Sequence, residues 1–223
     1  RLFSVNQNGA LLVNRAETNF SRFTPRFSVQ YRPDQRMMLY GSYSRGFKSG
    51  VFNTSSSSDI PVRPEILDAY EIGLKLDPIR KVRINISAFY YNYTDIQLSA
   101  RDTDTNAVRL LNAASARVKG AEGEVEIAPT RNLTVKFSGS YLDGTYTSFP
   151  GAVILTPLPA GGNAQAIGDV SGAVMIRSPK YTLGMMVAYH RELAGGEFDA
   201  SSNLFHSAKY YHDFQNRLVQ PAY

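Results

Sequence analysis

The chain has 223 residues, a formal net charge of +5 and no cysteine, which excludes disulfides, Fe–S clusters and zinc sites built from thiolates. Its 24 Lys and Arg residues are interspersed with 19 Asp and Glu and form no basic block, so the charge does not indicate a nucleic-acid-binding protein. No run of about 18 apolar residues predicts a membrane-spanning helix, and residues 1–10 lack the apolar segment of a signal peptide. The more informative bias is 14 Tyr and 12 Phe with no Trp.

The first part of the chain predicts two strands and a long loop. Residues 1–19 show no clear period, so we expect a loop or the end of an interrupted hairpin. Side chains begin to alternate between apolar and polar at Phe23. Residues 32–35 (RPDQ) predict a tight turn, because proline fixes φ and aspartate caps the reversal. A second strand is expected over residues 36–47, and the Ser-rich segment 48–63 is expected to be a long polar loop.

The strongest alternation in the chain lies in residues 82–95 (VRINISAFYYNYTD). Its first even-numbered positions are apolar and its first odd-numbered positions are polar, as the side-chain period of a strand requires. A strand over residues 66–76 and a short turn at residues 77–80 precede it. About ten such residues, when tilted, can cross a bilayer, although a half-buried strand of a soluble sandwich alternates in the same way. An interfacial aromatic girdle would be formed by Phe89, Tyr90, Tyr91 and Tyr93.

A further strand carries an unusual amount of negative charge. Residues 100–116 are expected to form a long loop, after which residues 118–128 alternate again. One face of that strand carries three glutamates, Glu122, Glu124 and Glu126. Unpaired carboxylates cannot be buried without a cost of several kcal/mol each, so this face must meet water or cations. After a turn at residues 129–132, Lys136 lies on the next strand as a candidate cross-strand partner for one of the glutamates.

The last third of the chain contains its longest connection. Residues 149–178 show no sustained period, and alternation returns over residues 181–190. Residues 194–196 predict a tight turn, residues 197–211 a last and more polar strand, and from His212 the pattern stops. The predicted connections are therefore alternately short and long along the chain. In a meander every second connection lies at the same end, and short turns at one end with long loops at the other are typical of outer-membrane barrels.

The sequence thus predicts an all-β protein, part of an antiparallel up-and-down transmembrane β-barrel with about eight strands. One face of the sheet is expected to meet lipid, and the other to line the lumen. Predicted lipid-facing side chains are Val82, Ile84, Ile86, Val135, Phe137, Leu183 and Val187. Predicted lumen-facing side chains are Glu71, Glu122, Glu124, Glu126 and Lys136.

No set of residues predicts catalysis, a metal site or a cofactor, so we expect a protein that is not an enzyme. The three histidines, His190, His206 and His212, have no zinc-binding spacing. Residues 102–104 (DTD) lack the glycine and distal glutamate of a calcium loop. The paired glycines at 161–162 and 195–196 lie outside any phosphate-binding motif and are expected in turns.

Five segments, in order along the chain, resemble the barrel of TonB-dependent outer-membrane receptors. They are residues 39–50 (LYGSYSRGFKSG), 64–75 (PEILDAYEIGLK), 88–91 (AFYY), 112–122 (NAASARVKGAE) and 207–211 (SAKYY). The resemblance covers about residues 20–223. It implies a 22-stranded barrel in the cell outer membrane, closed around an N-terminal plug. It also implies active, ligand-gated import of scarce ligands, commonly ferric siderophores, energised through TonB.

The chain departs from that pattern because it shows no plug, no TonB box and no closing strand. We therefore expect residues 1–223 to be a fragment of the β-barrel domain. The implied partners are outer-membrane lipid and lipopolysaccharide, the TonB complex through the plug, and a ferric siderophore or a similar ligand. The full-length receptor is expected to be a monomer that binds no nucleic acid. A passive porin-like channel and an outer-membrane enzyme remain alternatives.

Ligand recognition is expected in the long loops, chiefly residues 149–178 and 48–63, since loops of that length are usually functional or disordered. An apolar run in the first of these loops favours packing against a ligand or a plug over disorder. Two cations near the predicted loops could attract an anionic chelate or, equally, the phosphates of lipopolysaccharide. The candidates are Arg45, Lys48, Phe52, Val153, Ile154 and Leu155.

Overall fold

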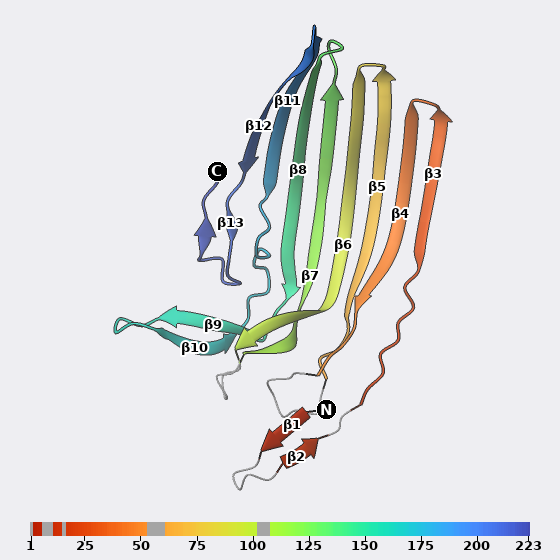
Figure 1. Cartoon of the computed structure of the whole chain (residues 1–223). Coiled ribbons are helices and arrows are strands. Elements are labelled where there is room, and N and C mark those ends of the chain that lie inside the picture. The colour runs from red at the N-terminus through yellow and green to blue at the C-terminus, as the bar shows by residue number, and fades with distance from the viewer. Residues whose placement is uncertain (1, 6–10, 15–16, 53–60, 102–107) are drawn as a thin grey trace.

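A computed structural model describes residues 2–5, 11–14, 17–52, 61–101 and 108–223 of the chain. Its main sheet has eight antiparallel strands in the order β12-β11-β8-β7-β6-β5-β4-β3. Each strand pairs with the next main-sheet strand along the chain, so the sheet is an up-and-down meander with open edges at β3 and β12 (Figure 1). The strands are β3 (Arg26–Asp34), β4 (Met37–Lys48), β5 (Glu65–Ile79), β6 (Val82–Arg101), β7 (Val108–Ile127), β8 (Leu133–Ser148), β11 (Tyr181–Leu193) and β12 (Gly196–Ser207).

Three small hairpins accompany the main sheet. They are β1 (Leu2–Val5) with β2 (Leu11–Asn14), β9 (Ala152–Pro157) with β10 (Asn163–Gly168), and β13 (Tyr210–Tyr211) with β14 (Val219–Gln220). Among the described residues, no helix is long and apolar enough to cross a membrane. The predicted all-β, antiparallel fold with about eight strands is confirmed, and the sheet does not close on itself.

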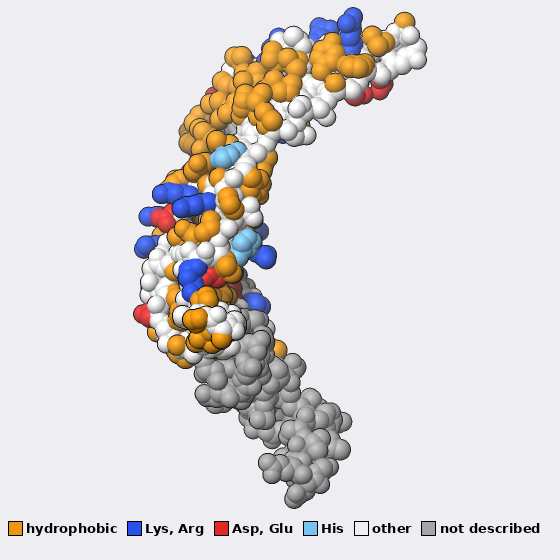
Figure 2. Space-filling model, turned by 90° about the vertical axis from the view of Figure 1, so that its left-hand side faces the viewer, with side chains coloured by type: hydrophobic (Ala, Val, Ile, Leu, Met, Phe, Trp, Pro, Cys, Tyr) orange, Lys and Arg blue, Asp and Glu red, His pale blue; other side chains and the backbone are white. Residues whose placement is uncertain are grey.

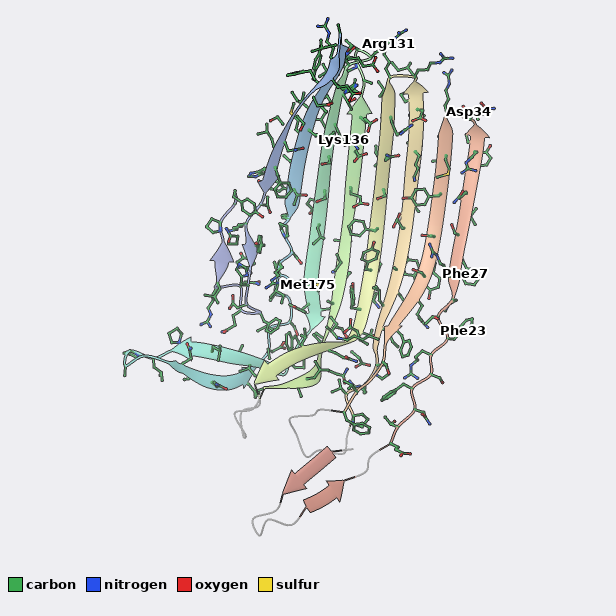
Figure 3. The ribbon with its side chains drawn as sticks, in the orientation of Figure 1. Phe23, Phe27, Asp34, Arg131, Lys136 and Met175 are labelled. Atoms are coloured by element: carbon green, nitrogen blue, oxygen red, sulfur yellow. The ribbon has the colours of Figure 1, made fainter. Side chains whose placement is uncertain are left out.

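The two ends of the sheet differ in the length of their connections. The short turns all lie at one end, which we call the turn end, where Figure 3 labels Asp34 and Arg131. The predicted cap of the first turn is present, since Asp34 Oδ1 accepts a hydrogen bond of 2.7 Å from the backbone N–H of Arg36. The turn between β11 and β12 uses Gly195 at a φ of 93°, a conformation that favours glycine. The longer connections lie at the opposite end, which we call the loop end.

One predicted loop is wrong in its bounds, and its residues 102–107 lie outside the described residues. The sequence predicts a loop over residues 100–116, but β6 and β7 continue to pair as far as Arg101 and Val108. The alternation fails because Asp95 has a φ of 55° and the register shifts between Tyr93 and Gln97. Such a bulge reverses the faces of the residues that follow, so the period of two is lost while the strands stay paired.

Other boundaries also differ from the sequence-based prediction. Within residues 1–19, where we expect a loop or the end of an interrupted hairpin, β1 and β2 pair with each other as a hairpin, and the last strand ends at Ser207 rather than at residue 211. The segment 149–178 holds the hairpin β9–β10, whose six-residue strands are too short to show a period. The middle of the predicted loop 48–63 and the segment 102–104 lie outside the described residues, and a bridge pairs Val51 with Val62 beside the former.

The register sorts side chains onto two faces. Val82, Ile127, Val135 and Val187 are cross-strand partners in one row, which belongs to what we call the apolar face. All seven predicted lipid-facing residues share this face, and all five predicted lumen-facing residues share the opposite, polar face. Figure 2, which looks onto the β12 edge, shows hydrophobic side chains gathered on one side of the upper part of the sheet.

The predicted aromatic girdle is partly wrong. Of the four residues expected to form it, only Tyr90 lies on the apolar face. Phe89 and Tyr91 lie on the polar face and stack with ring centroids 4.9 Å apart, because consecutive residues of a strand point to opposite sides. A different row crosses the apolar face near the loop end, with successive centroid distances of 6.4, 4.9 and 6.4 Å. It consists of Phe27, Tyr43, Tyr70 and Tyr90.

The buried core lies at the loop end of the polar face. It contains Ile96, Ala114, Ala116, Tyr146, Phe149 and Ala152. Phe214 packs against it with edge-to-face contacts to Tyr146 and Phe149, at centroid distances of 5.9 and 5.2 Å. The long connection after β8 therefore folds over the polar face of the sheet.

Candidate functional site

The polar face carries a chain of paired acidic groups. Lys136 Nζ lies 3.3 Å from Glu126 and 3.6 Å from Glu124, which confirms the predicted cross-strand pairing. Tyr40 donates a hydrogen bond of 2.6 Å to Glu71, and Ser87 donates one of 3.2 Å to Glu122. Of these residues, Tyr40, Ser87, Glu122 and Glu124 border a hollow of about 580 Å³, with further hydroxyl groups from β8 and β11. The hollow is therefore a hydrophilic surface, in keeping with the water-facing role predicted for the glutamates.

A second cavity, of about 550 Å³, lies at the loop end, and we call it the loop-end pocket. One wall comes from the segment around β9 and contributes Phe149, Val153, Leu155, Pro157 and Asn163. The other wall is residues 212–218, which contribute His212, Asp213, Phe214, Gln215, Arg217 and Leu218. The pocket thus combines an apolar and aromatic lining with a few polar groups, which is the composition of small-molecule binding sites.

The two walls of the loop-end pocket are tied together by hydrogen bonds. The backbone N–H of Leu155 donates to Gln215 Oε1 at 3.0 Å, and the Arg217 guanidinium donates to the carbonyl of Leu155. Asn216 makes two further bonds to the backbone of Val174, both of 2.9 Å. Because each tie joins residues that are more than forty positions apart, the pocket depends on the tertiary fold.

Two aspartates shape the turns that hold these walls. Asp213 Oδ1 accepts hydrogen bonds from the backbone N–H groups of Arg217 and Leu218, at 2.8 and 2.7 Å. Asp169 accepts from the hydroxyl and the backbone N–H of Ser171, and these bonds lower the pKa of Asp169 from its usual range. The Ser171 hydroxyl in turn accepts from the N–H of Phe149 at 2.8 Å, so the carboxylate supports the start of the pocket wall.

The structure brings together only some of the predicted ligand-loop residues. Val153 and Leu155 line the pocket, whereas Ile154 packs against the core. Arg45 lies on the apolar face, 2.7 Å from Asp68. Lys48 ends β4 and Phe52 follows it, and neither lines the pocket. The sequence pattern also missed residues 212–218, which have no period, although an aspartate with an asparagine three residues later is a turn signal there.

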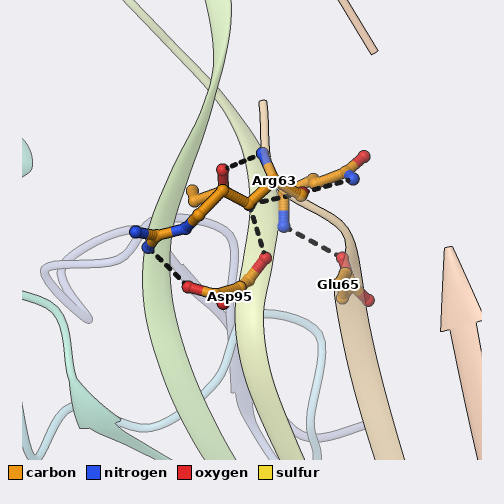
Figure 4. A network of polar contacts seen from close by, with 5 residues as sticks. Arg63, Glu65 and Asp95 are labelled. Atoms are coloured by element: carbon orange, nitrogen blue, oxygen red, sulfur yellow. Dashed lines mark hydrogen bonds and ion pairs between the residues drawn. The ribbon is translucent and has the colours of Figure 1, made fainter. Parts of the chain in front are cut away.

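A polar network fastens the start of β5 to the bulged part of β6 and β7 (Figure 4). Asn112 accepts from the N–H of Arg63 at 2.5 Å, and donates to the carbonyls of Arg63 and Asp95, both at 2.8 Å. The Arg63 guanidinium lies 2.6 Å from Asp95 Oδ1. Gln97 donates to the carbonyls of Ser49 and Arg63, at 2.9 and 3.0 Å. The ends of the connection between β4 and β5 are thereby held at the loop end.

These features define a class of protein. An open, eight-stranded antiparallel meander with one apolar face, one polar face and connections of unequal length at its two ends is part of a β-barrel of the outer-membrane type. The match to the family described as TonB dependent receptor-like, beta-barrel extends over residues 1–223, and the chain belongs to this family.

Solved structures show the same fold. The chain is similar to the ferric yersiniabactin uptake receptor FyuA from Yersinia pestis, with a TM-score of 0.73 at 19% identity. It is also similar to the siderophore receptor PiuA and to the ferric preacinetobactin receptor BauA, both from Acinetobacter baumannii, with TM-scores of 0.69 and 0.68 at 18% and 20% identity. Each comparison covers 96% of this chain and 30% of the other, so the chain spans about a third of the length of these receptors.

Proposed function

We propose that this chain forms part of an importer of ferric siderophores in the cell outer membrane, energised through TonB. In this proposal the polar face lines the lumen, the apolar face meets lipid and the loop end lies outside the cell. The family supports the transport class. The similar structures include receptors of ferric yersiniabactin and ferric preacinetobactin and a siderophore receptor, which favours this class of ligand.

The loop-end pocket is the observation that carries the proposal. Its aromatic and aliphatic side chains can pack against the organic frame of a chelate, and Arg217 and His212 can meet oxygens that bear negative charge. The pocket lies at the loop end, and a separate hydrophilic hollow lies on the polar face. A passive channel has no need of an apolar pocket at its mouth, so the pocket favours the receptor over the porin-like alternative.

The test is uptake of radiolabelled iron by cells that express the receptor from its intact gene. We expect uptake of at least one chelate from a panel of hydroxamate, catecholate and phenolate siderophores, and its loss when a protonophore collapses the membrane potential. The double variant Leu155→Asp, Leu218→Asp should weaken binding at least about tenfold, because it places two charges in the apolar lining.

The matched control is Leu158→Asp, since Leu158 lies exposed in the turn of the same hairpin and outside the pocket lining. It should leave binding unchanged. Uptake that is indifferent to the protonophore and limited only by solute size would support a passive channel instead. Equal binding by the double variant and the control would remove the pocket from the ligand site.

A further inference from the structure

We propose that the β11–β12 hairpin carries a binding site for a divalent transition-metal ion of the Zn²⁺ class, formed by His190, Glu197 and Asp199. The three side chains lie on the polar face near the turn end of the sheet, where Figure 3 labels Arg131. The loop-end pocket lies at the opposite end, so the inference does not rest on the proposed function.

The register of the hairpin brings the three ligands together. His190 and Asp199 are direct cross-strand partners, and Glu197 lies two residues before Asp199 on the same face. The tight turn at Gly195 fixes this register. Because the ligands come from two strands, and His190 and Asp199 are nine positions apart, the spacing along the chain does not show the site.

The distances between the three side chains suit a metal ion. His190 Nδ1 lies 2.8 Å from Asp199 Oδ1, so these two atoms share a proton that a metal could replace. The ligand atoms of His190, Glu197 and Asp199 all lie within 4.8 Å of one another. Ligands held tetrahedrally at about 2.0–2.1 Å from Zn²⁺ lie about 3.3 Å apart. Small changes in the rotamers of the two exposed carboxylate side chains bridge the difference.

The backbone of the histidine is held in place from a second strand. The side-chain amide of Asn132 donates to the carbonyl of His190 at 2.7 Å, and the N–H of His190 donates to the carbonyl of Asn132 at 2.8 Å. A ligand fixed in this way loses little freedom when the metal binds. A hollow of about 290 Å³ lies beside His190 and Asp199, bordered also by Thr134 and Ser201, and gives room for the water molecules that complete the coordination.

The charges around the site call for a cation. Glu192 lies directly opposite Glu197 in the row next to His190, and like charges in that position destabilise a sheet. In the part of the chain that the structure describes, no Lys or Arg lies within ion-pair distance of either glutamate, whereas Lys136 pairs with the glutamates of β7. Arg131 borders the same hollow, but its single charge does not balance three carboxylates. A divalent ion would remove the repulsion.

The donor atoms indicate which class of ion fits. An imidazole nitrogen with carboxylate oxygens suits Zn²⁺ and its first-row neighbours, whereas Mg²⁺ and Ca²⁺ prefer ligand sets made only of oxygen. The bound ion would fasten β12 to β11 near the turn end. It would therefore stabilise the hairpin that forms one edge of the described sheet.

The experiment measures Zn²⁺ binding by the receptor expressed from its intact gene. Purified receptor is treated with EDTA, which is then removed, and is titrated with ZnCl₂ in a calorimeter. Loss of an outer-shell partner alone weakens metal binding about 10- to 100-fold, so His190→Gln, which removes a direct ligand, should weaken this binding at least about a hundredfold. The matched control is His206→Gln, since His206 belongs to the same hairpin but pairs with Leu183 on the apolar face. It should bind Zn²⁺ as the wild type does.

Two further measurements identify the ion and its place. Millimolar Mg²⁺ should not displace Zn²⁺. Zn²⁺ should slow the hydrogen exchange of residues 190–199 in the wild type and not in His190→Gln, with the turn at residues 34–37 as an internal reference. Equal Zn²⁺ binding by the wild type and His190→Gln, an equal loss in His206→Gln, displacement by Mg²⁺, or exchange that Zn²⁺ leaves unchanged would each overturn the proposal. Heat-modifiable migration in gels shows that each variant is folded.

Discussion

At the scale of single residues, the two faces of β6 should differ in how well they tolerate a charged side chain. Ile84 belongs to the apolar row with Val125 and Phe137, whereas Asn85 lies opposite Glu124 on the polar face. We predict that Ile84→Arg lowers the free energy of unfolding by about 2 to 4 kcal/mol, since it places a charge in the bilayer, while Asn85→Arg changes it little. Unfolding in urea of the receptor in lipid vesicles measures both. Equal losses at the two positions would show that the apolar face does not meet lipid.

Asp169 gives the loop-end pocket a dependence on pH. Hydrogen bonds from Ser171 lower the pKa of this carboxyl below its unfolded value of about 3.9. A lowered folded pKa stabilises the fold above the unfolded value, and this contribution is lost as the pH falls through the folded pKa. We predict that the exchange rate of the amides in residues 149–171, relative to the intrinsic rate at the same pH, rises below about pH 4 in the wild type. In Asp169→Asn, exchange should be faster at neutral pH and should lack this rise, whereas an unchanged pH profile would contradict the role of Asp169.

At the scale of strands, the sequence pattern was reliable where one face is continuously apolar. The residues 82–90 alternate without interruption, and the structure places both predicted sets of side chains on single faces. The pattern failed beyond Asp95, because a bulge reverses the faces while the pairing continues. It failed also at β9 and at residues 212–218, where contacts between distant segments, such as Gln215 with Leu155, decide the conformation. The sequence therefore predicted residues of only one wall of the loop-end pocket, the one around β9.

The network around Asn112 explains how the bulged strands stay attached to β5. Its side chain makes three hydrogen bonds to backbone groups of Arg63 and Asp95, and the Arg63 carbonyl accepts a further one from Gln97. We predict that Asn112→Ala costs about 1 to 3 kcal/mol of local stability, since it removes the acceptor of the Arg63 N–H and the donor to the Asp95 carbonyl. Hydrogen exchange of residues 61–65 should increase accordingly, with β11 as an internal reference. Exchange that rises equally in β11 would indicate a global loss of stability in place of a local one.

At the scale of the whole molecule, the open sheet has consequences that no single strand shows. The backbone groups of β3 and β12 that face away from the sheet have no strand to pair with in the described fold. Hydrocarbon offers no hydrogen bonds, and each unsatisfied backbone group costs several kcal/mol there. The curvature of the sheet, like its apolar and polar faces, is that of a barrel wall, and a wall encloses a lumen only when its edges meet. The chain therefore gains its full stability only when both edges are covered.

The last prediction follows from those edges. We expect the 223-residue chain, expressed alone and added to planar bilayers, to aggregate and to form no channel of defined conductance, because eight strands with the curvature of a larger barrel leave two rows of backbone groups in lipid. The receptor expressed from its intact gene is the control, and should migrate as a heat-modifiable monomer. If the chain alone forms a heat-modifiable monomer with discrete conductance, β3 and β12 must pair with each other in the membrane. The eight strands would then be a complete small barrel with a lumen filled by the glutamates and Lys136 of the polar face.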